Sequence, residues 1–168
     1  MTVMSLHSSP PSAVAEAEDL QLKVDLCSEA FEPFACLEQW HRQLAAIGRW
    51  SAANSHFIGR VRSMATNGTP LLALELEHYP GMTERQLQQL ATALCSRHGA
   101  DSCLIQHRIG RVLPGNAIVL VGIGADRRGP AQRCCQDLLE ALKHDTPFWK
   151  REWRSDGTGE WLIGNTPL

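Results

Sequence analysis

Residues 102–123, SCLIQHRIGRVLPGNAIVLVGI, hold apolar segments on either side of a turn. Short runs of apolar and β-branched residues predict strands over 102–107 and 109–113, and a further strand over 117–123. The residues Pro-Gly-Asn at 114–116 are a strong turn signal, because proline and glycine supply the backbone angles that turns require. Strands joined by a short turn pair in an antiparallel way. This stretch therefore predicts an antiparallel hairpin.

Helices and further strands flank this hairpin on both sides. Thr83 is expected to begin one helix, with Gln86 completing a capping box three residues later. Consecutive strands joined directly by turns outnumber strands joined through a helix. This order favours an α+β fold with a mostly antiparallel sheet over a doubly wound fold. The predicted elements are strands over 20–26, 56–61 and 72–78, helices over 34–44, 83–99 and 129–144, and a terminal hairpin of 148–153 with 160–163.

Composition separates the first nineteen residues from the rest. Residues 8–13 read SSPPSA, which is typical of a disordered segment, and no basic stretch leads into an apolar core as in a secretory signal. No run in the chain approaches the roughly 18 apolar residues that span a membrane. We expect a disordered tail over residues 1–19, one domain over residues 20–168, and no association with a membrane.

The six cysteines have no spacing that indicates a metal site. None forms a C-x-x-C pair, and Cys134 and Cys135 are adjacent on a predicted helix, so their side chains point about 100° apart. This pattern indicates reduced thiols that behave as small core residues in a cytoplasmic protein. A single reactive thiol is the alternative interpretation.

Charge is distributed unevenly along the chain. The net charge is −2, so the whole molecule is not a polycation of the kind that binds nucleic acid. Residues 1–38 hold seven acidic residues and one basic residue, whereas residues 39–168 hold fifteen basic and eleven acidic ones. An anion-binding site is therefore expected in the later part. A nucleic-acid-binding α+β domain is an alternative that salt-dependent affinity for RNA or DNA would support.

Lysine is rare in this chain and occurs only at positions 23, 143 and 150. Lys143 and Lys150 flank the segment 144–149, so two primary amines are close in sequence. An amine loses its proton when it is desolvated or crowded by other cations, and it then acts as a base or nucleophile, which a guanidinium does not do. The alternative is structural, with Lys143 stabilising a helix C-terminus and Lys150 solvated on a strand.

The basic residues of the later part lie at the ends of predicted elements. Arg127 and Arg128 precede the helix over 129–144, where free backbone N–H groups and guanidinium groups favour an anion. Lys143 lies at the far end of this helix, about 22 Å away at a rise of 1.5 Å per residue. A shared pocket must therefore be completed by other elements or by a second subunit. The alternative is a set of unrelated, solvated charges.

Five short motifs follow one another along the chain, namely FIGRVR at 57–62, HYPGM at 78–82, HRIG at 107–110, LPG at 113–115 and PFWKRE at 147–152. In the last of them, the aromatic pair Phe148-Trp149 lies directly beside the second of the two amines. Together, in this order, the motifs resemble one family, that of the large, catalytic subunit of molybdopterin synthase, or MoaE family. The resemblance runs from about residue 20 to residue 162.

The resemblance implies a fold, a partner and a reaction. The fold is the α/β-hammerhead type of α+β domain, with two long helices and a C-terminal hairpin, in a homodimer. A small ubiquitin-like sulfur-carrier subunit docks at each end to give a heterotetramer, and its Gly-Gly tail carries a thiocarboxylate. Sulfur passes from this tail to cyclic pyranopterin monophosphate and forms the dithiolene of molybdopterin. No cofactor and no metal are implied.

The resemblance also implies roles for individual residues. Lys143 matches the lysine at the end of the family's long helix and Lys150 the lysine of its K-R-E motif, so both are expected to be catalytic. Arg127 stands where the family has histidine, and because arginine keeps its proton this position suits phosphate binding. A module of the same fold that holds the partner tail without turnover is the alternative function. The implied substrate-binding residues are Arg60, Val61, Arg62, Arg127, Arg128, Arg151 and Glu152.

Overall fold

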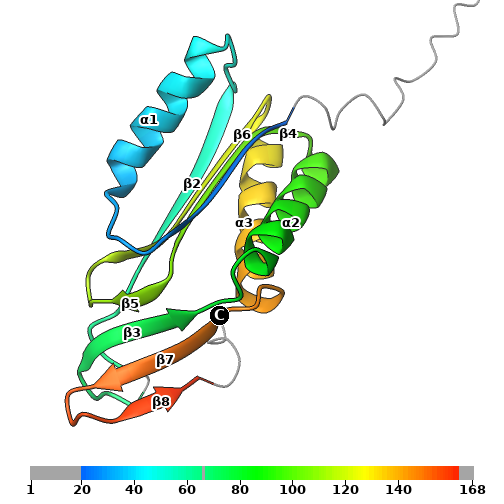
Figure 1. Cartoon of the computed structure of the whole chain (residues 1–168). Helices are drawn as coiled ribbons and strands as arrows, with labels where there is room; N and C mark the ends of the chain where they lie inside the picture. The colour runs from blue at the N-terminus through cyan, green and yellow to red at the C-terminus, as the bar shows by residue number, and fades with distance from the viewer. Residues whose placement is uncertain (1–19, 66, 163–168) are drawn as a thin grey trace, which may run out of the picture.

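The computed structural model describes residues 20–65 and 67–162, and in it two β-sheets follow one another along the molecule (Figure 1). Within these residues, three helices lie against the first sheet and none lies over the second (Figure 1). The elements in chain order are β1 (Gln21–Cys27), α1 (Pro33–Ala46), β2 (Ala53–Arg60), β3 (Leu71–Glu77), α2 (Met82–His98), β4 (Ala100–Arg108), β5 (Gly110–Val112), β6 (Ala117–Ala125), α3 (Arg128–His144), β7 (Trp149–Arg154) and β8 (Gly159–Trp161).

The strands are mostly antiparallel, as predicted, although they form two sheets rather than one. The first sheet has the order β1-β4-β6-β2, in which only β1 and β4 are parallel. The second sheet has the order β5-β3-β7-β8 and is antiparallel throughout. The terminal hairpin predicted from the sequence is the pair β7 and β8.

Gly110 is the residue at which the chain leaves the first sheet for the second. Its φ of +70° lies in the left-handed region that glycine adopts without strain. Before it, β4 pairs with β6 in the first sheet, with Ser102 opposite Gly124. After it, β5 pairs with β3 in the second sheet, with Gly110 opposite Leu76. The predicted hairpin is thus present, but its first arm is divided between two sheets.

The two faces of the first sheet are covered by different helices. α2 and α3 pack side by side on one face, where Leu87, Ile105 and Leu138 belong to the main hydrophobic core (Figure 1). On the other face, Trp40 of α1 packs above Gly122 of β6. A Cβ atom at position 122 would lie 2.9 Å from the Trp40 ring, so glycine leaves the room that this indole fills.

The start of α2 differs from the sequence prediction, which placed a capping box at Thr83 and Gln86. The N-cap residue is Gly81, whose N–H donates to a carboxylate oxygen of Glu84 at 2.6 Å. The Thr83 hydroxyl instead accepts from the N–H of Tyr79 at 3.2 Å. The Gln86 amide donates to the backbone carbonyl of Asp145 and so ties α2 to the end of α3. The capping-box prediction was wrong because Glu84, two residues earlier, takes the capping role.

The cysteines confirm the expectation of free thiols. All six are free, and four of them, namely Cys95, Cys103, Cys134 and Cys135, are buried in the core. Among the described residues, no group of three histidine, cysteine or carboxylate side chains is placed to hold a metal ion. The same part of the chain has no helix long and apolar enough to cross a membrane. The tail expected over residues 1–19 lies outside the described residues.

Candidate functional site

A cavity of about 330 Å³ lies where the C-terminal end of α3 meets both sheets. Strands of the first sheet supply one wall, α3 supplies the second, and β7 of the second sheet supplies Lys150. Most of the wall is apolar, which lowers the dielectric around the charged groups. The lining residues are Phe57, His107, Val119, Leu139, Glu140, Leu142, Lys143 and Lys150. We call this the lysine pocket.

A tight turn after α3 brings the two lysines together. Lys143 lies in the last turn of the helix, and Asp145 follows as the C-cap residue. The Thr146 hydroxyl then donates to the carbonyl of Leu142, and the N–H of Phe148 donates to the carbonyl of Thr146 at 2.9 Å. β7 begins at the next residue, so the chain reverses direction between the amines. This turn places Lys143 and Lys150 on the wall of one cavity.

The environment of Lys150 changes its acid–base behaviour. Burial lowers the pKa of this amine below its ordinary value, because a desolvated ammonium loses hydration energy. The positive charge of Lys143 lowers the pKa further. Both causes favour the neutral amine, which is the form that accepts a proton or attacks an electrophile.

Phe148 and Trp149, the two aromatic residues before Lys150, lie in different environments. The Phe148 ring stacks on the imidazole of His107, with centroids 4.2 Å apart and an angle of 13° between the planes. Trp149 is 44% exposed and meets Tyr79 edge to face at 4.8 Å. Only Phe148 packs against the main core. One ring therefore belongs to the core, and the other lies at the surface.

His107 is a pocket residue to which sequence reasoning assigned no role. Its Nδ1 lies 2.8 Å from the backbone carbonyl oxygen of Arg108. Desolvation by burial is the main cause that lowers the pKa of His107 to about 4, and the charge of Lys150 acts in the same direction. The available signal was the HRIG motif at 107–110, which appeared only as part of the family resemblance. Phe57 was missed in the same way, as part of the FIGRVR motif. Glu140 lies in none of the motifs, but its position three residues before Lys143 on the same helix could have placed it beside that lysine.

The arginines at the start of α3 do not line the lysine pocket. Arg127 is the N-cap residue and Arg128 begins the helix, at the opposite end from Lys143. The guanidinium of Arg127 is exposed and lies 3.6 Å from the carboxylate of Asp126. Within one chain, these two arginines and the two lysines therefore form separate clusters.

Arg60 is the last residue of β2 and Val61 and Arg62 follow it, and none of the three lines the lysine pocket. The Arg60 guanidinium donates to the backbone carbonyl of Gly115 at 3.1 Å. Val61 is 5% exposed and packs with Leu76 in the small core of the second sheet, so its side chain serves packing. Arg62 is exposed.

Arg151 and Glu152 belong to the same strand as Lys150 but are held by their own partners. The guanidinium of Arg151 lies 3.2 Å from the carboxylate of Glu75 and 4.3 Å from the ring centroid of Trp161. Glu152 is buried, with its carboxylate 3.9 Å from the guanidinium of Arg154. Because side chains alternate along a strand, Arg151 points to the opposite face from Lys150.

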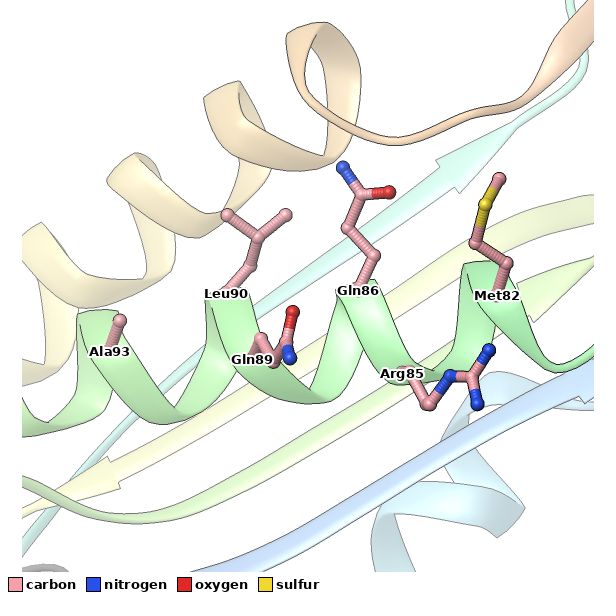
Figure 2. Close-up of a pocket in the computed structure, with 6 residues that line it drawn as sticks. All are labelled: Met82, Arg85, Gln86, Gln89, Leu90 and Ala93. Carbon is pink, nitrogen blue, oxygen red and sulfur yellow. The ribbon is translucent and has the colours of Figure 1, made fainter.

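A second hollow, of about 440 Å³, runs along the outside of α2 (Figure 2). Met82, Gln86 and Leu90 point to one side of the helix there, and Arg85 points to the other. Arg85 is the only charged residue in its lining, so this groove offers no pair of groups for acid–base or nucleophilic chemistry. The lysine pocket is the better candidate for an active site.

Comparison with known proteins decides the family. The model of the MoaE protein family matches residues 31–145, which is more than half of the chain. The chain belongs to the MoaE family. Two similar relatives are both named molybdopterin synthase catalytic subunit. The protein from Ralstonia nicotianae is 39% identical over 62% of this chain and 59% of its own length. The protein from Pseudomonas aeruginosa is 38% identical over 80% of this chain and 86% of its own length.

Solved structures agree with this assignment. The molybdopterin biosynthesis MoaE protein from Burkholderia ambifaria matches with a TM-score of 0.68 and 32% identity, over 89% of this chain and 92% of that one. A complex of subunits 1 and 2 of molybdopterin-converting factor from Helicobacter pylori matches with a TM-score of 0.68 at 19% identity, over 83% of this chain and 89% of that one, and this match shows the fold alone. The predicted α+β fold of the MoaE type is therefore confirmed. The family's role lies in molybdopterin biosynthesis.

Proposed function

We propose that this MoaE chain is the sulfur-transferring subunit of a molybdopterin synthase. Its reactants are the C-terminal thiocarboxylate of a small ubiquitin-like partner subunit and cyclic pyranopterin monophosphate. The observation that carries the proposal is the placement of Lys143 and Lys150 on one cavity, with burial and the neighbouring amine lowering the pKa of Lys150. The names of the relatives support it.

The charges of the pocket suit two anionic reactants. Each sulfur transfer breaks the bond between sulfur and the acyl carbon of the tail and forms a carbon–sulfur bond on the pterin. As each carbon–sulfur bond forms, a carbon–oxygen bond of the pterin breaks, and the displaced oxygen leaves as water or stays on the phosphate. The acyl group of the tail takes an oxygen from water and ends as a carboxylate. Negative charge develops on the oxygen of the acyl group during this exchange, and fixed cations in a desolvated site stabilise it strongly.

The two lysines are assigned to different reactants. Lys143 acts at the acyl carbon of the partner tail or moves protons there, since its flexible side chain lies at the open end of a helix. Lys150, whose pKa is lowered by burial, assists proton transfer on the pterin side. Because a thiocarboxylate carries the sulfur, the six cysteines need no part in the reaction.

In the proposed enzyme, the arginine at the start of α3 reaches the lysine pocket of a second copy in a homodimer. Arg128 lies about 22 Å from Lys143 along one helix, at a rise of 1.5 Å per residue. A second copy that presents its Arg128 and Arg62 to the lysine pocket supplies guanidinium groups for the phosphate. With a sulfur-carrier subunit bound to each copy, the assembly is a heterotetramer. The free cysteines favour the reducing cytoplasm as its location.

The test is reconstitution from purified components. The chain is mixed with thiocarboxylated partner and cyclic pyranopterin monophosphate, and molybdopterin is quantified. We expect wild-type protein to form product and Lys143→Ala to form none, with the fold and partner binding unchanged, because the variant loses only an amine at the end of a helix. Lys23→Ala is the matched control, since Lys23 lies on β1 and pairs with Asp25.

Two results would count against the proposal. Near wild-type turnover by Lys143→Ala would remove this lysine from the reaction. A wild-type chain that binds the partner tail but forms no product would instead support the non-catalytic module of the same fold.

A further inference from the structure

His107 presents an unprotonated ring nitrogen in the lysine pocket. A backbone carbonyl only accepts hydrogen bonds, so the contact of 2.8 Å between Nδ1 and the Arg108 oxygen places the ring proton on Nδ1. Nε2 is therefore the acceptor. No hydrogen bond to Nε2 is present among residues 20–65 and 67–162, and the side chain lines the cavity.

The ring is held rigidly in this orientation. Phe148 stacks on it at 4.2 Å with an angle of 13° between the planes, which fixes the tilt of the imidazole. The hydrogen bond to the Arg108 carbonyl fixes its rotation. The residue is 7% exposed, so little of the ring besides the edge at the cavity meets solvent. A pre-organised acceptor loses little entropy when a ligand binds it.

The setting keeps this imidazole neutral. Burial lowers the pKa of His107 to about 4, and the charge of Lys150 contributes to the decrease. A third cation beside Lys143 and Lys150 is therefore avoided, and Nε2 stays an acceptor throughout the neutral pH range. Nε2 of His107 thus adds a neutral acceptor to a lining that also holds two amines and the carboxylate of Glu140.

We propose that His107 is a ligand-contacting residue whose Nε2 accepts a hydrogen bond from an amide-type N–H of the molecule that enters the lysine pocket. Two reactants of the proposed function offer such a group, namely the glycine amides of the partner tail and the ring of the pterin. The proposal rests on that function for the identity of the ligands. The position and tautomer of His107 are independent of it.

Two substitutions of His107 distinguish the acceptor role of Nε2 from the structural hydrogen bond that Nδ1 donates to the Arg108 carbonyl. His107→Asn keeps an N–H near the position of Nδ1 for the Arg108 carbonyl but has no atom at the position of Nε2. His107→Gln reaches the position of Nε2 with an oxygen that accepts and leaves the carbonyl of Arg108 without its donor. His98→Asn is the matched control, because His98 is a partly buried histidine that bonds to Asp137 at 2.8 Å, outside the pocket lining.

The experiment measures kcat/KM for sulfur transfer with partner and pterin varied in turn. We expect His107→Asn to lose about tenfold, the effect of one neutral hydrogen bond, and His107→Gln to retain most activity. The reactant whose KM rises in His107→Asn is the one that His107 contacts. Nitrogen NMR of labelled histidine should show a protonated Nδ1 and a bare Nε2 at neutral pH.

Results that contradict the role of His107 differ from results that contradict the proposed function. If wild-type protein turns over and His107→Asn matches it, or if His107→Gln loses more than His107→Asn, the role of His107 is structural. A proton on Nε2 in the NMR spectrum would also overturn the inference, whatever the activity. If the wild-type protein forms no molybdopterin, the proposed function fails instead.

Discussion

At the scale of single residues, the chemistry of this chain depends on where it places its few amines. Lys150 lies on β7, an inner strand of the second sheet, and lines the lysine pocket, whereas Lys23 lies on the edge strand β1, 3.6 Å from the carboxylate of Asp25. The ammonium group of Lys150 is therefore buried, whereas that of Lys23 is partly exposed to water. Burial and the neighbouring Lys143 both make the ammonium form of Lys150 less favourable.

This difference predicts a pH dependence for Lys150. Because burial and a neighbouring cation lower its pKa, it should lose its proton at a lower pH than a lysine side chain in water. The rate at which a small amine-reactive reagent acylates Lys150, followed by mass spectrometry, should therefore reach its midpoint at a lower pH than for a lysine in a short unstructured peptide.

Lys143→Gln tests whether the charge of Lys143 lowers the pKa of Lys150. The variant removes a positive charge, so the pKa of Lys150 and the midpoint of its acylation should move to higher pH, toward the ordinary lysine value. The wild-type protein, acylated in parallel with the same batch of reagent, is the control. A Lys150 midpoint that stays fixed or moves to lower pH would contradict the electrostatic coupling of the two amines.

At the scale of elements, α3 determines which charges one chain can bring together. The helix runs from Arg128 to His144, as the spacing of its buried residues predicted, so its bounds were accessible from sequence. The same length keeps Arg128 and Lys143 about 22 Å apart at 1.5 Å per residue. A site that uses both must take them from different copies.

The requirement for two copies predicts complementation between inactive variants. Lys143→Ala and Arg128→Ala are each expected to lose sulfur transfer. When the two are unfolded and refolded together, random pairing should give one intact site in half of the dimers, or roughly a quarter of wild-type activity. The control is each variant refolded alone, which should stay inactive. If the mixture is no more active than its components, Arg128 does not complete the pocket of a second copy.

Other elements show where sequence patterns were insufficient. The start of α2 was misplaced because Thr83 and Gln86 fit the capping-box pattern, whereas the backbone of Gly81, with φ of +77°, favours Glu84 as the partner. Gln86 instead serves a contact with Asp145, which is distant in sequence and invisible to a local pattern. The strand over 109–113 was predicted, but its place in the second sheet depends on pairing with β3, which is distant in sequence.

At the scale of the whole molecule, the lysine pocket exists because two sheets meet. Phe57, His107 and Val119 come from the first sheet, while Lys150 comes from the second. The family motifs identified both lysines, but the pairing of distant strands assembles the cavity wall, and no local signal in the sequence encodes it. This is why His107 was missed although its motif was recognised.

The central claim is that a primary amine at position 143, rather than positive charge alone, is required for sulfur transfer. Lys143→Arg tests it most directly, because arginine keeps the charge but neither loses its proton nor acts as a nucleophile. In the reconstituted assembly, we predict normal binding of the partner tail and a fall in molybdopterin formation of about a hundredfold or more. Turnover by Lys143→Arg close to that of the wild type would contradict the account.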